Sequence, residues 1–409
     1  MALMSVGDAL ARVLEGVAPL PGEPAALVDA ADRVLAADVA ALRTQPPEDL
    51  SAMDGYAARA EDVAQAPATL TLVGEVAAGR PFAGTVGPGQ AARIFTGGVV
   101  PAGADTIVIQ ENTTINTEAD GARVTVTVPA TRGRHIRRAG LDFTKGQVLL
   151  SRGHRLSDRD LMLAAAMNHP AVPVHRRSKV AVLGTGDELK PPGSIPGPGE
   201  IIYSNGFALM ALARAEGAEV IDLGVVPDRI DATVAAVRRA RASGADILMT
   251  TGGASVGDYD LVQKGLAAEG LALSFWRVAL RPGRPMMHGH LGAMHVLGLP
   301  GNPVSAYVCA VLFLVPLIRR LAGRADVEPQ TESAVLGRDL PENDERADYL
   351  RASLATGPDG SLVATPFPPQ DSSMMALLAK ADGLVIREPF APAAKAGSRC
   401  KILRLKRAL

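Results

Sequence analysis

The spacing of hydrophobic and polar positions changes along the chain and divides it into blocks. Between residues 6 and 17 apolar residues recur at helical intervals, which predicts an amphipathic helix, and a second helix is predicted over residues 29–37. From residue 69 to residue 128, short β-type runs are broken by Gly and Pro. That pattern is typical of a small, mostly β block.

A further helix is predicted over residues 156–167, where Ser157 and Asp160 have the spacing of a capping box. We take this helix to rejoin the first segment, so that the β-rich block is an insertion. Beyond residue 332 the runs are again short and strand-like, which predicts a small β-barrel or sandwich.

Between residues 179 and 270 buried-strand runs alternate with helical segments. Apolar runs at 180–183, 219–223 and 247–249 predict strands, and Asn205 is a candidate N-cap for the helix after the first of them. The order β-α-β-α-β-α predicts a parallel sheet with helices on both faces.

The fold class predicted is therefore multidomain α/β plus β. A central doubly wound, mostly parallel α/β domain is joined to an N-terminal helical and β-rich region and to a C-terminal small β-barrel. The predicted domains are residues 1–45 with 140–177 (N-terminal linker domain), 46–139 (inserted β-rich domain), 178–327 (α/β domain) and 328–409 (barrel).

Composition narrows the class of protein. A net charge of −1 over 409 residues gives no electrostatic reason to expect nucleic acid. The two cysteines form no metal-binding or redox spacing, and the first residues lack a basic region followed by an apolar core. The longest apolar run, residues 304–318, is shorter than the roughly 18 residues of a membrane span. We expect a cytoplasmic protein that binds neither nucleic acid nor membrane.

Hydroxyls, glycines and carboxylates follow the predicted strand at 247–249. Glycines let backbone N–H groups approach an anion, and hydroxyls add donors. Carboxylates just beyond would repel a phosphate unless a cation lay between, so they suggest Mg²⁺. Taken alone, the stretch fits a tight strand-to-helix turn equally well. Its polar and glycine members are Thr250, Thr251, Gly252, Gly253, Ser255, Gly257, Asp258 and Asp260.

Similar loops follow the neighbouring strands. Ligands of open α/β sheets bind beyond the carboxyl ends of the strands, where these loops would meet. Arginines nearby suit phosphate or another oxyanion. Asn302 and Pro303 suit the start of a helix, and ordinary capping accounts for Asn302. The residues concerned are Gly184, Thr185, Gly186, Asp187, Glu188, Asp228, Arg277, Arg281, Arg284, Pro300, Gly301, Asn302 and Pro303.

Three histidines, His288, His290 and His295, fit strand positions better than a metal-ligand set. Asp54 before Gly55 is, by itself, a turn signal, and Thr96 before two glycines is a weak anion-binding signal.

The chain carries the motifs of one known family in the family's order. They are residues 51–57, 184–188, 251–257, 281–285 and 299–305. Together they resemble the molybdopterin molybdenumtransferase (MoeA) family, which includes the gephyrin E domain, over nearly the whole chain. The resemblance implies an elongated, four-domain homodimer with a MogA-like, molybdopterin-binding central domain.

The resemblance also implies the reaction. Molybdenum from molybdate is inserted into adenylyl-molybdopterin, and the adenylate is hydrolysed to AMP in a Mg²⁺-dependent step. Other proteins of molybdenum cofactor biosynthesis are possible partners. Two alternatives stay open: an adenylyltransferase for the same pterin, which would consume ATP, and a non-catalytic scaffold that binds the pterin or peptides.

Roles for individual residues follow from the same resemblance. The Mg²⁺ ligands would be Asp187, Glu188, Asp228, Asp258 and Asp260. The catalytic residues would be Asp54, Thr96, Asp142, Glu188, Asp228 and Asp260, the first three from the same chain or from a partner subunit. Cofactor-binding residues would be Gly184 to Asp187, Thr250 to Gly253, Ser255, Gly257, Arg277, Arg281, Arg284, Pro300 to Pro303 and Ser372. Ser373, Arg346 and Arg351 are further candidates from the last domain.

The chain departs from the family pattern at two lysines. Arg281 and Arg284 stand where the family usually has lysine, so a planar fork replaces a compact ammonium group. Thr251 and Ala254 replace the usual serine and valine, which keeps the hydroxyl.

Overall fold

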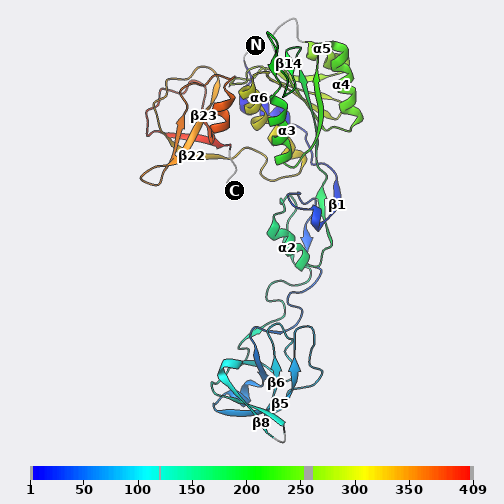
Figure 1. The fold of residues 1–409 in the computed structure, drawn as a ribbon, viewed down its shortest axis with the longest axis vertical. Coiled ribbons are helices and arrows are strands. Elements are labelled where there is room, and N and C mark those ends of the chain that lie inside the picture. The colour runs from blue at the N-terminus through cyan, green and yellow to red at the C-terminus, as the bar shows by residue number, and fades with distance from the viewer. Residues whose placement is uncertain (1–2, 119–120, 253–260, 406–409) are drawn as a thin grey trace.

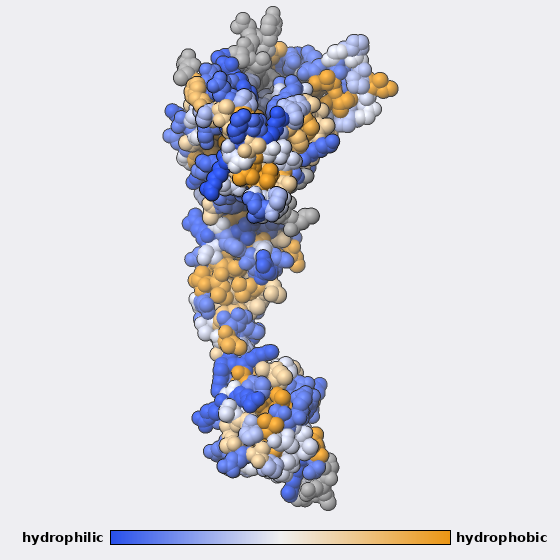
Figure 2. All heavy atoms as spheres, turned by 90° about the vertical axis from the view of Figure 1, so that its left-hand side faces the viewer, coloured by the Kyte–Doolittle hydropathy of each residue, from blue (hydrophilic) through white to orange (hydrophobic). Residues whose placement is uncertain are grey.

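The computed structural model describes residues 3–118, 121–252 and 261–405 and shows an elongated molecule (Figure 1). The α/β part and the C-terminal part lie side by side at one end, and the β-rich block lies at the other. A narrow waist joins the two ends, and Figure 2 shows the constriction from the side. The predicted fold class is confirmed.

The first helix begins where the sequence predicts it and ends at Leu14, before the predicted end at residue 17. Helix α1 (Val6–Leu14) begins after Ser5, whose Oγ accepts a hydrogen bond from the Asp8 backbone N–H at 3.1 Å. Its buried residues, Ala9 and Val13, join the large core beneath the α/β sheet. The capping residue and the apolar stripe thus account for this helix.

The helix predicted over residues 29–37 is wrong. The chain there makes one 3₁₀ turn (Leu27–Asp29), and Asp32 adopts a left-handed φ of 63°. The backbone N–H groups of Leu35 and Ala36 donate to His154 and Pro173 carbonyls instead of to a preceding turn. Pairing with a distant segment therefore overrides local helix propensity.

The waist is built where the chain runs out to the β-rich block and returns. Short antiparallel pairs join the two passages, and helix α2 (Asp158–Ala166) packs beside them. Its capping box is confirmed, since Ser157 Oγ accepts from Asp160 N and the Asp160 carboxylate accepts from Ser157 N. The pairs are β1 (Gly22–Ala26) with β12 (Ala171–His175), β2 (Val39–Ala40) with β11 (Val148–Leu150) and β3 (Leu50–Ser51) with β10 (Ile136–Arg137).

The β-rich block is a six-stranded mixed sheet in the order β7-β4-β6-β5-β9-β8. Small apolar clusters cover each of its faces. Strand β4 is buried along its whole length and pairs with β6 and β7. The strands are β4 (Gly55–Ala58), β5 (Ala68–Val76), β6 (Gln90–Ile94), β7 (Thr106–Ile109), β8 (Thr113–Glu118) and β9 (Gly121–Val126).

The α/β part contains a six-stranded sheet in the order β16-β13-β17-β21-β20-β18. The first four strands are parallel, and β20 and β18 are antiparallel additions. Alternate residues of β13 face two different cores. One is closed by α3, α6 (Pro303–Cys309) and α7 (Val315–Leu321), and the other by α4 and α5. The elements are β13 (Lys179–Thr185), α3 (Asn205–Ala215), β16 (Glu219–Val226), α4 (Ile230–Ala242), β17 (Ile247–Thr251), α5 (Leu261–Ala268), β18 (Ala272–Trp276), β20 (Met287–Leu291) and β21 (Met294–Leu299).

The long apolar helix after β21 is a core helix. It runs from Pro303 to Leu321 as α6 (Pro303–Cys309), a π-helical turn (Ala310–Leu314) and α7 (Val315–Leu321). The helical run is longer than the apolar stretch that the sequence suggested, and its length and composition alone would suit a membrane span. However, 83% of its apolar window is buried inside the protein. The π turn precedes Pro316, which has no N–H to continue the regular ladder.

The C-terminal part is the predicted small barrel. Strand β23 pairs with both β24 and β25, which closes the ring β23-β24-β22-β26-β25. Strand β19 (Leu280–Arg281), which leaves the α/β part, pairs with β23 and fixes the barrel against the sheet. The elements are β22 (Thr331–Leu336), β23 (Ala347–Thr356), β24 (Leu362–Pro366), α8 (Met375–Lys380), β25 (Gly383–Arg387) and β26 (Arg399–Arg404).

Candidate active site at the strand ends of the α/β sheet

The loops predicted to bind a ligand leave the same edge of the sheet. Thr185 at the end of β13 pairs with Val226 at the end of β16, and Thr251 at the end of β17 pairs with Leu299 at the end of β21. The loops that follow these strands therefore start side by side. Residues 253–260, which include the predicted Gly253, Ser255, Gly257, Asp258 and Asp260, lie outside the described residues.

Carboxylates gather where β13 and β16 end. The Asp228 backbone N–H donates to Asp187 Oδ1 at 3.1 Å. Partial burial, followed by the negative charges of Asp187 and Glu188, raises the pKa of Asp228 above its usual range. Like charges held together in this way favour a proton or a metal cation between them. Oxygen donors of this kind are the ligands that Mg²⁺ prefers.

Glycines allow the backbone to approach closely at this edge. Gly252 has a φ of 91°, and a Cβ at this position would lie 2.4 Å from the Thr185 carbonyl oxygen. The Thr185 hydroxyl in turn donates to the Thr251 carbonyl at 3.4 Å. Gly252 also lies beside the next loop, since a Cβ on Gly301 would be 3.8 Å from the Gly252 Cα. Only glycine fits such a position without strain.

The loop after β21 is held by side chains from two other elements. Asn205 Nδ2 donates to the Gly301 carbonyl at 2.7 Å, and Asn302 Nδ2 donates to Ser372 Oγ at 2.9 Å. The Val304 N–H donates to the Ser372 carbonyl at 3.0 Å. The structure thus brings the predicted Ser372 from the barrel to this loop.

Two capping assignments need correction. Asn302 occupies the N-cap position of α6 with Pro303 in the first turn, as predicted, but its side chain makes no capping hydrogen bond. Ser204, rather than Asn205, occupies the N-cap position of α3. In both cases the asparagine amide forms a hydrogen bond to a neighbouring loop instead of to the helix end.

Arg351 positions the loop that carries Ser372. It is only 1% exposed, and its guanidinium donates to the carbonyls of Asp371 at 2.8 Å and Met374 at 2.9 Å. Its backbone N–H and its Nε both donate to Gln370 Oε1. Burial lowers the pKa of Arg351, which nevertheless stays a cation. Arg351 therefore fixes the backbone on both sides of Ser372.

The Arg281 guanidinium is bound by carboxylates of the C-terminal part. Its Nε donates to Asp348 Oδ1 at 2.6 Å and its Nη1 to Asp344 Oδ2 at 3.0 Å. Arg346 also binds Asp344, and this contact is the largest cause of the lowered pKa of Asp344, which is about 2. The structure thus places Arg281 and Arg346 in an ion-pair cluster between β19 and the barrel, a different setting from the oxyanion site predicted for Arg281.

The other two arginines of that segment have different surroundings. Arg277 has a φ of 98°, and its guanidinium carbon lies 5.6 Å from the centre of the Trp276 ring. Arg284 is exposed, and its carbonyl accepts from the backbone of Val278 and Met286.

Asp54 and Thr96 form a local pair far from the strand ends. Asp54 Oδ1 accepts from the Thr96 N–H at 2.7 Å and from its hydroxyl at 2.8 Å, and these bonds lower the pKa of Asp54. Both residues belong to the β-rich block at the opposite end of the molecule (Figure 1), and Asp142 is exposed near the waist. A single chain does not bring these three residues to the carboxylate cluster.

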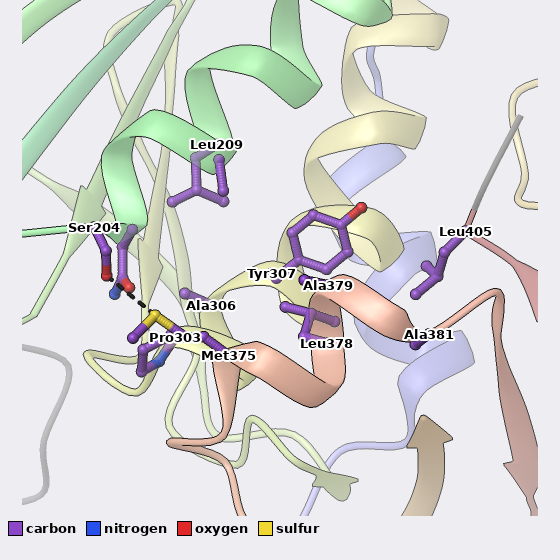
Figure 3. Close-up of a pocket in the computed structure, with 12 residues that line it drawn as sticks. Ser204, Leu209, Pro303, Ala306, Tyr307, Met375, Leu378, Ala379, Ala381 and Leu405 are labelled. Atoms are coloured by element: carbon purple, nitrogen blue, oxygen red, sulfur yellow. Dashed lines mark hydrogen bonds between the residues drawn. The ribbon is translucent and has the colours of Figure 1, made fainter. Parts of the chain in front are cut away.

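An apolar pocket of about 360 Å³ lies beside the loop after β21 (Figure 3). Helices α3, α6 and α8 form its walls, and Ser204 Oγ donates to Met375 Sδ at 3.4 Å across it. Sequence reasoning missed this pocket because its walls come from segments about 170 residues apart. The apolar residues that line it include Leu209, Pro303, Ala306, Tyr307, Met375, Leu378 and Leu405.

Comparisons with known proteins cover nearly the whole chain. Residues 4–168 match the MoeA N-terminal region (domain I and II), residues 181–320 match a probable molybdopterin binding domain, and residues 333–405 match the MoeA C-terminal region (domain IV).

Curated relatives match over similar lengths. The chain is 34% identical to a molybdopterin molybdenumtransferase of Haemophilus influenzae over 94% of this chain and 95% of that protein. It is also 34% identical to the Bacillus subtilis protein of that name, over 93% and 89%. A crystal structure of the molybdopterin biosynthesis MoeA protein from Pyrococcus horikoshii superposes with a TM-score of 0.82 at 27% identity, over 99% and 100% of the two chains.

Proposed function

The chain belongs to the molybdopterin molybdenumtransferase (MoeA) family, and from this premise we propose which of its residues act in the reaction. It is an enzyme of molybdenum cofactor biosynthesis. We propose that it inserts molybdenum from molybdate into adenylyl-molybdopterin and that Mg²⁺-dependent hydrolysis of the adenylate releases AMP.

The observation that carries this proposal is the gathering of Asp187, Glu188 and Asp228 where β13 and β16 end, with the Asp228 N–H donating to Asp187 Oδ1. Partial burial and the two neighbouring negative charges raise the pKa of Asp228 accordingly. All the donors in the cluster are carboxylate oxygens, which fits Mg²⁺. These three residues, together with the predicted Asp258 and Asp260, would hold the ion. A bound Mg²⁺ supplies positive charge to the phosphoanhydride as it is cleaved.

The chain's own groups would bind and orient the substrate. The glycine-lined edge at Gly252 and Gly301 lets backbone N–H groups approach phosphate oxygens. Ser372, fixed by Asn302, contributes a hydroxyl at the rim. Because Arg281 is already matched by two carboxylates, we assign the molybdate oxyanion to Arg277 and exposed Arg284.

The test is AMP release from adenylyl-molybdopterin with Mg²⁺, with and without molybdate. We expect molybdate-dependent release by the wild type and none by Asp228→Ala. Asp231→Ala is the matched control. Asp231 is an exposed acid that also lies at the start of α4, and it is paired with Arg229. Formation of adenylylated pterin from ATP would instead favour an adenylyltransferase. Binding without either reaction would favour a scaffold.

We further propose a homodimer in which the partner subunit completes the cleft. This proposal is supported by the position of Asp54 and Thr96 at the far end of the chain from Asp228. In a two-fold dimer, one β-rich block can lie against the strand ends of the other chain.

Mixed dimers distinguish this arrangement from a site within one chain. Asp54→Asn and Asp228→Asn are each expected to be inactive. When the two variants are mixed and allowed to exchange subunits, half of the dimers are hybrids with one intact cleft, so about a quarter of the wild-type activity returns. If both variants are inactive and the exchanged mixture stays inactive, the two residues act within one chain. An Asp54→Asn variant that is active on its own would show that Asp54 has no catalytic part.

We propose the cytoplasm as the location and other molybdenum cofactor biosynthesis proteins as partners. Two unpaired cysteines, one buried and one half-buried, are compatible with a reducing compartment. The adenylated substrate must come from an adenylyl-transfer reaction, which makes the enzyme of that step the first partner to test.

A further inference from the structure

Three histidines meet on β20 and β21, where the parallel strands of the α/β sheet adjoin the antiparallel ones. His288 and His290 are two residues apart on β20, and His290 pairs directly with His295 on β21. Because alternate residues of a strand share a face, all three imidazoles project from the same face of the hairpin. The sequence indicated ordinary strand residues, since the register that brings His295 opposite His290 is a property of the fold.

The distances between the rings suit a single metal ion. His288 Nε2 and His295 Nδ1 are 3.4 Å apart, and one ligand nitrogen from each of the three rings lies within 4.8 Å of the others. Two nitrogens bound tetrahedrally to Zn²⁺ at about 2.0–2.1 Å would lie about 3.4 Å apart. The His290 ring centre is 4.6 Å from that of His295 and 5.0 Å from that of His288. A small rotation of His290 would therefore complete a three-nitrogen site.

Two of the three rings are shielded from solvent, since His295 is only 7% exposed and His288 is not exposed at all. His288 is fully buried, and its Nδ1 has no hydrogen-bond partner in the described structure. The nitrogen that faces His295 is the other one, Nε2, and Nε2 is therefore the atom of His288 that would bind the ion.

The charges around the cluster are balanced. Asp246, whose negative charge acts on His295, is bound by the Arg176 guanidinium at 2.7 and 2.8 Å and by the Lys179 backbone N–H. The aromatic ring of Phe275 covers His288 at 5.6 Å between ring centres. His290 is half-buried, which leaves solvent access for a water molecule as the fourth ligand.

The cluster is separate from the strand-end site. His295 pairs with Ile247 at the start of β17, whereas Leu299 pairs with Thr251 at its end. Four residues of extended strand separate the two positions by about 13 Å. The donors also differ, because imidazole nitrogens favour Zn²⁺ and its neighbours in the first transition row, whereas carboxylates favour Mg²⁺.

We propose that His288, His290 and His295 form a binding site for one divalent transition metal, with Zn²⁺ as the best fit, that ties β20 to β21. A metal held by both strands would stabilise the antiparallel edge of the sheet without taking part in catalysis.

The test uses the full chain, stripped with a chelator and titrated with Co²⁺ as a spectroscopic probe. We expect one Co²⁺ per chain with the visible absorption of four-coordinate nitrogen ligation, displaced by Zn²⁺ and unaffected by excess Mg²⁺. His290→Ala should weaken binding at least tenfold. His290 is suited to this test because it is half-buried and its loss should not prevent folding, which circular dichroism would verify.

A matched control and a second readout complete the test. His154→Ala removes an exposed histidine that pairs with Asp160 in the waist, and it should leave Co²⁺ binding unchanged. Zn²⁺ should raise the unfolding midpoint of the wild type and not that of His290→Ala. Equal binding by wild type and His290→Ala, or the absence of four-coordinate absorption in the wild type, would overturn the proposal.

Discussion

Replacing Asp228 with asparagine should make the metal-free protein more stable while making it inactive. Asp228 carries a raised pKa because it is partly buried beside Asp187 and Glu188. The change to asparagine removes one negative charge, and the hydrogen bond to Asp187 survives because its donor is the backbone N–H. Functional sites commonly hold such unfavourable charge in exchange for ligand binding.

The size of the effect follows from the charges. Unit charges about 6 Å apart repel by about 0.7 kcal/mol in water and by more at a partly buried site. Asp187 and Glu188 are exposed, so the water value is the closer guide for each pair. With two such neighbours, Asp228→Asn should raise the free energy of unfolding by about 1 kcal/mol at low salt.

The pH dependence gives the sign of the effect. A pKa raised in the folded state means that ionised Asp228 destabilises the fold at neutral pH. As the pH falls through this raised pKa, the wild type takes up a proton and recovers the lost stability. The advantage of Asp228→Asn should therefore be present at neutral pH and disappear under acid conditions.

The assay is urea unfolding of metal-free protein followed by tryptophan fluorescence. Trp276 is the single tryptophan and lies on β18 of the sheet concerned. Mg²⁺ should stabilise the wild type and have a smaller effect on the variant. Asp231→Asn is the control and should bring no stabilisation, because Arg229 lowers the pKa of Asp231. A variant less stable than the wild type at neutral pH, or an advantage that grows in acid, would refute the reasoning.

Three further predictions concern two buried charged side chains and one close approach of the backbone. Glu216→Ala should lower the free energy of unfolding by about 3–5 kcal/mol in urea titrations, because two largely buried arginines lose their shared carboxylate. Arg351→Lys should lower it by about 2 kcal/mol, since the fork that holds two carbonyls is lost, and should also slow AMP release. Gly252→Ala should be destabilising by about 3 kcal/mol, and Gly244→Ala, at a similar φ in open space, by about 1 kcal/mol. Equal effects of the two alanines would show that the approach of Gly252 to Thr185 is unimportant.

The strand-end arrangement could be predicted because it depends on local patterns. Apolar runs at residues 180–183 and 247–249, separated by helical segments, specify parallel strands. Parallel strands put their carboxyl ends at one edge, so Glu188, Asp228 and Gly252 come together without knowledge of any distant contact. The domain boundaries stay a prediction.

The surroundings of Arg281 and the conformation of residues 29–37 could not be predicted. Both depend on contacts between distant segments, which local sequence patterns do not show. Arg281 suggests an anion site from the sequence alone, because nothing near it in the chain shows that its charge is paired. Its partners, Asp344 and Asp348, lie 63 and 67 residues away in the C-terminal part. Residues 29–37 have helix-forming composition, yet Leu35 finds its hydrogen bond at His154. In each case the partner is decided by tertiary packing.

The waist has a mechanical consequence. The chain crosses it as two adjacent passages joined by short antiparallel pairs, whereas the β19–β23 pairing and the Arg281 ion pairs fasten the barrel to the α/β sheet. A narrow two-stranded ribbon twists far more easily than a multi-stranded sheet. We therefore expect the α/β part and the barrel to move together as one rigid body. The β-rich block should change its orientation relative to them by bending at the waist. In the proposed dimer, this bending would swing Asp54 of one chain toward or away from the carboxylates of the other, while the carboxylate geometry itself stays fixed.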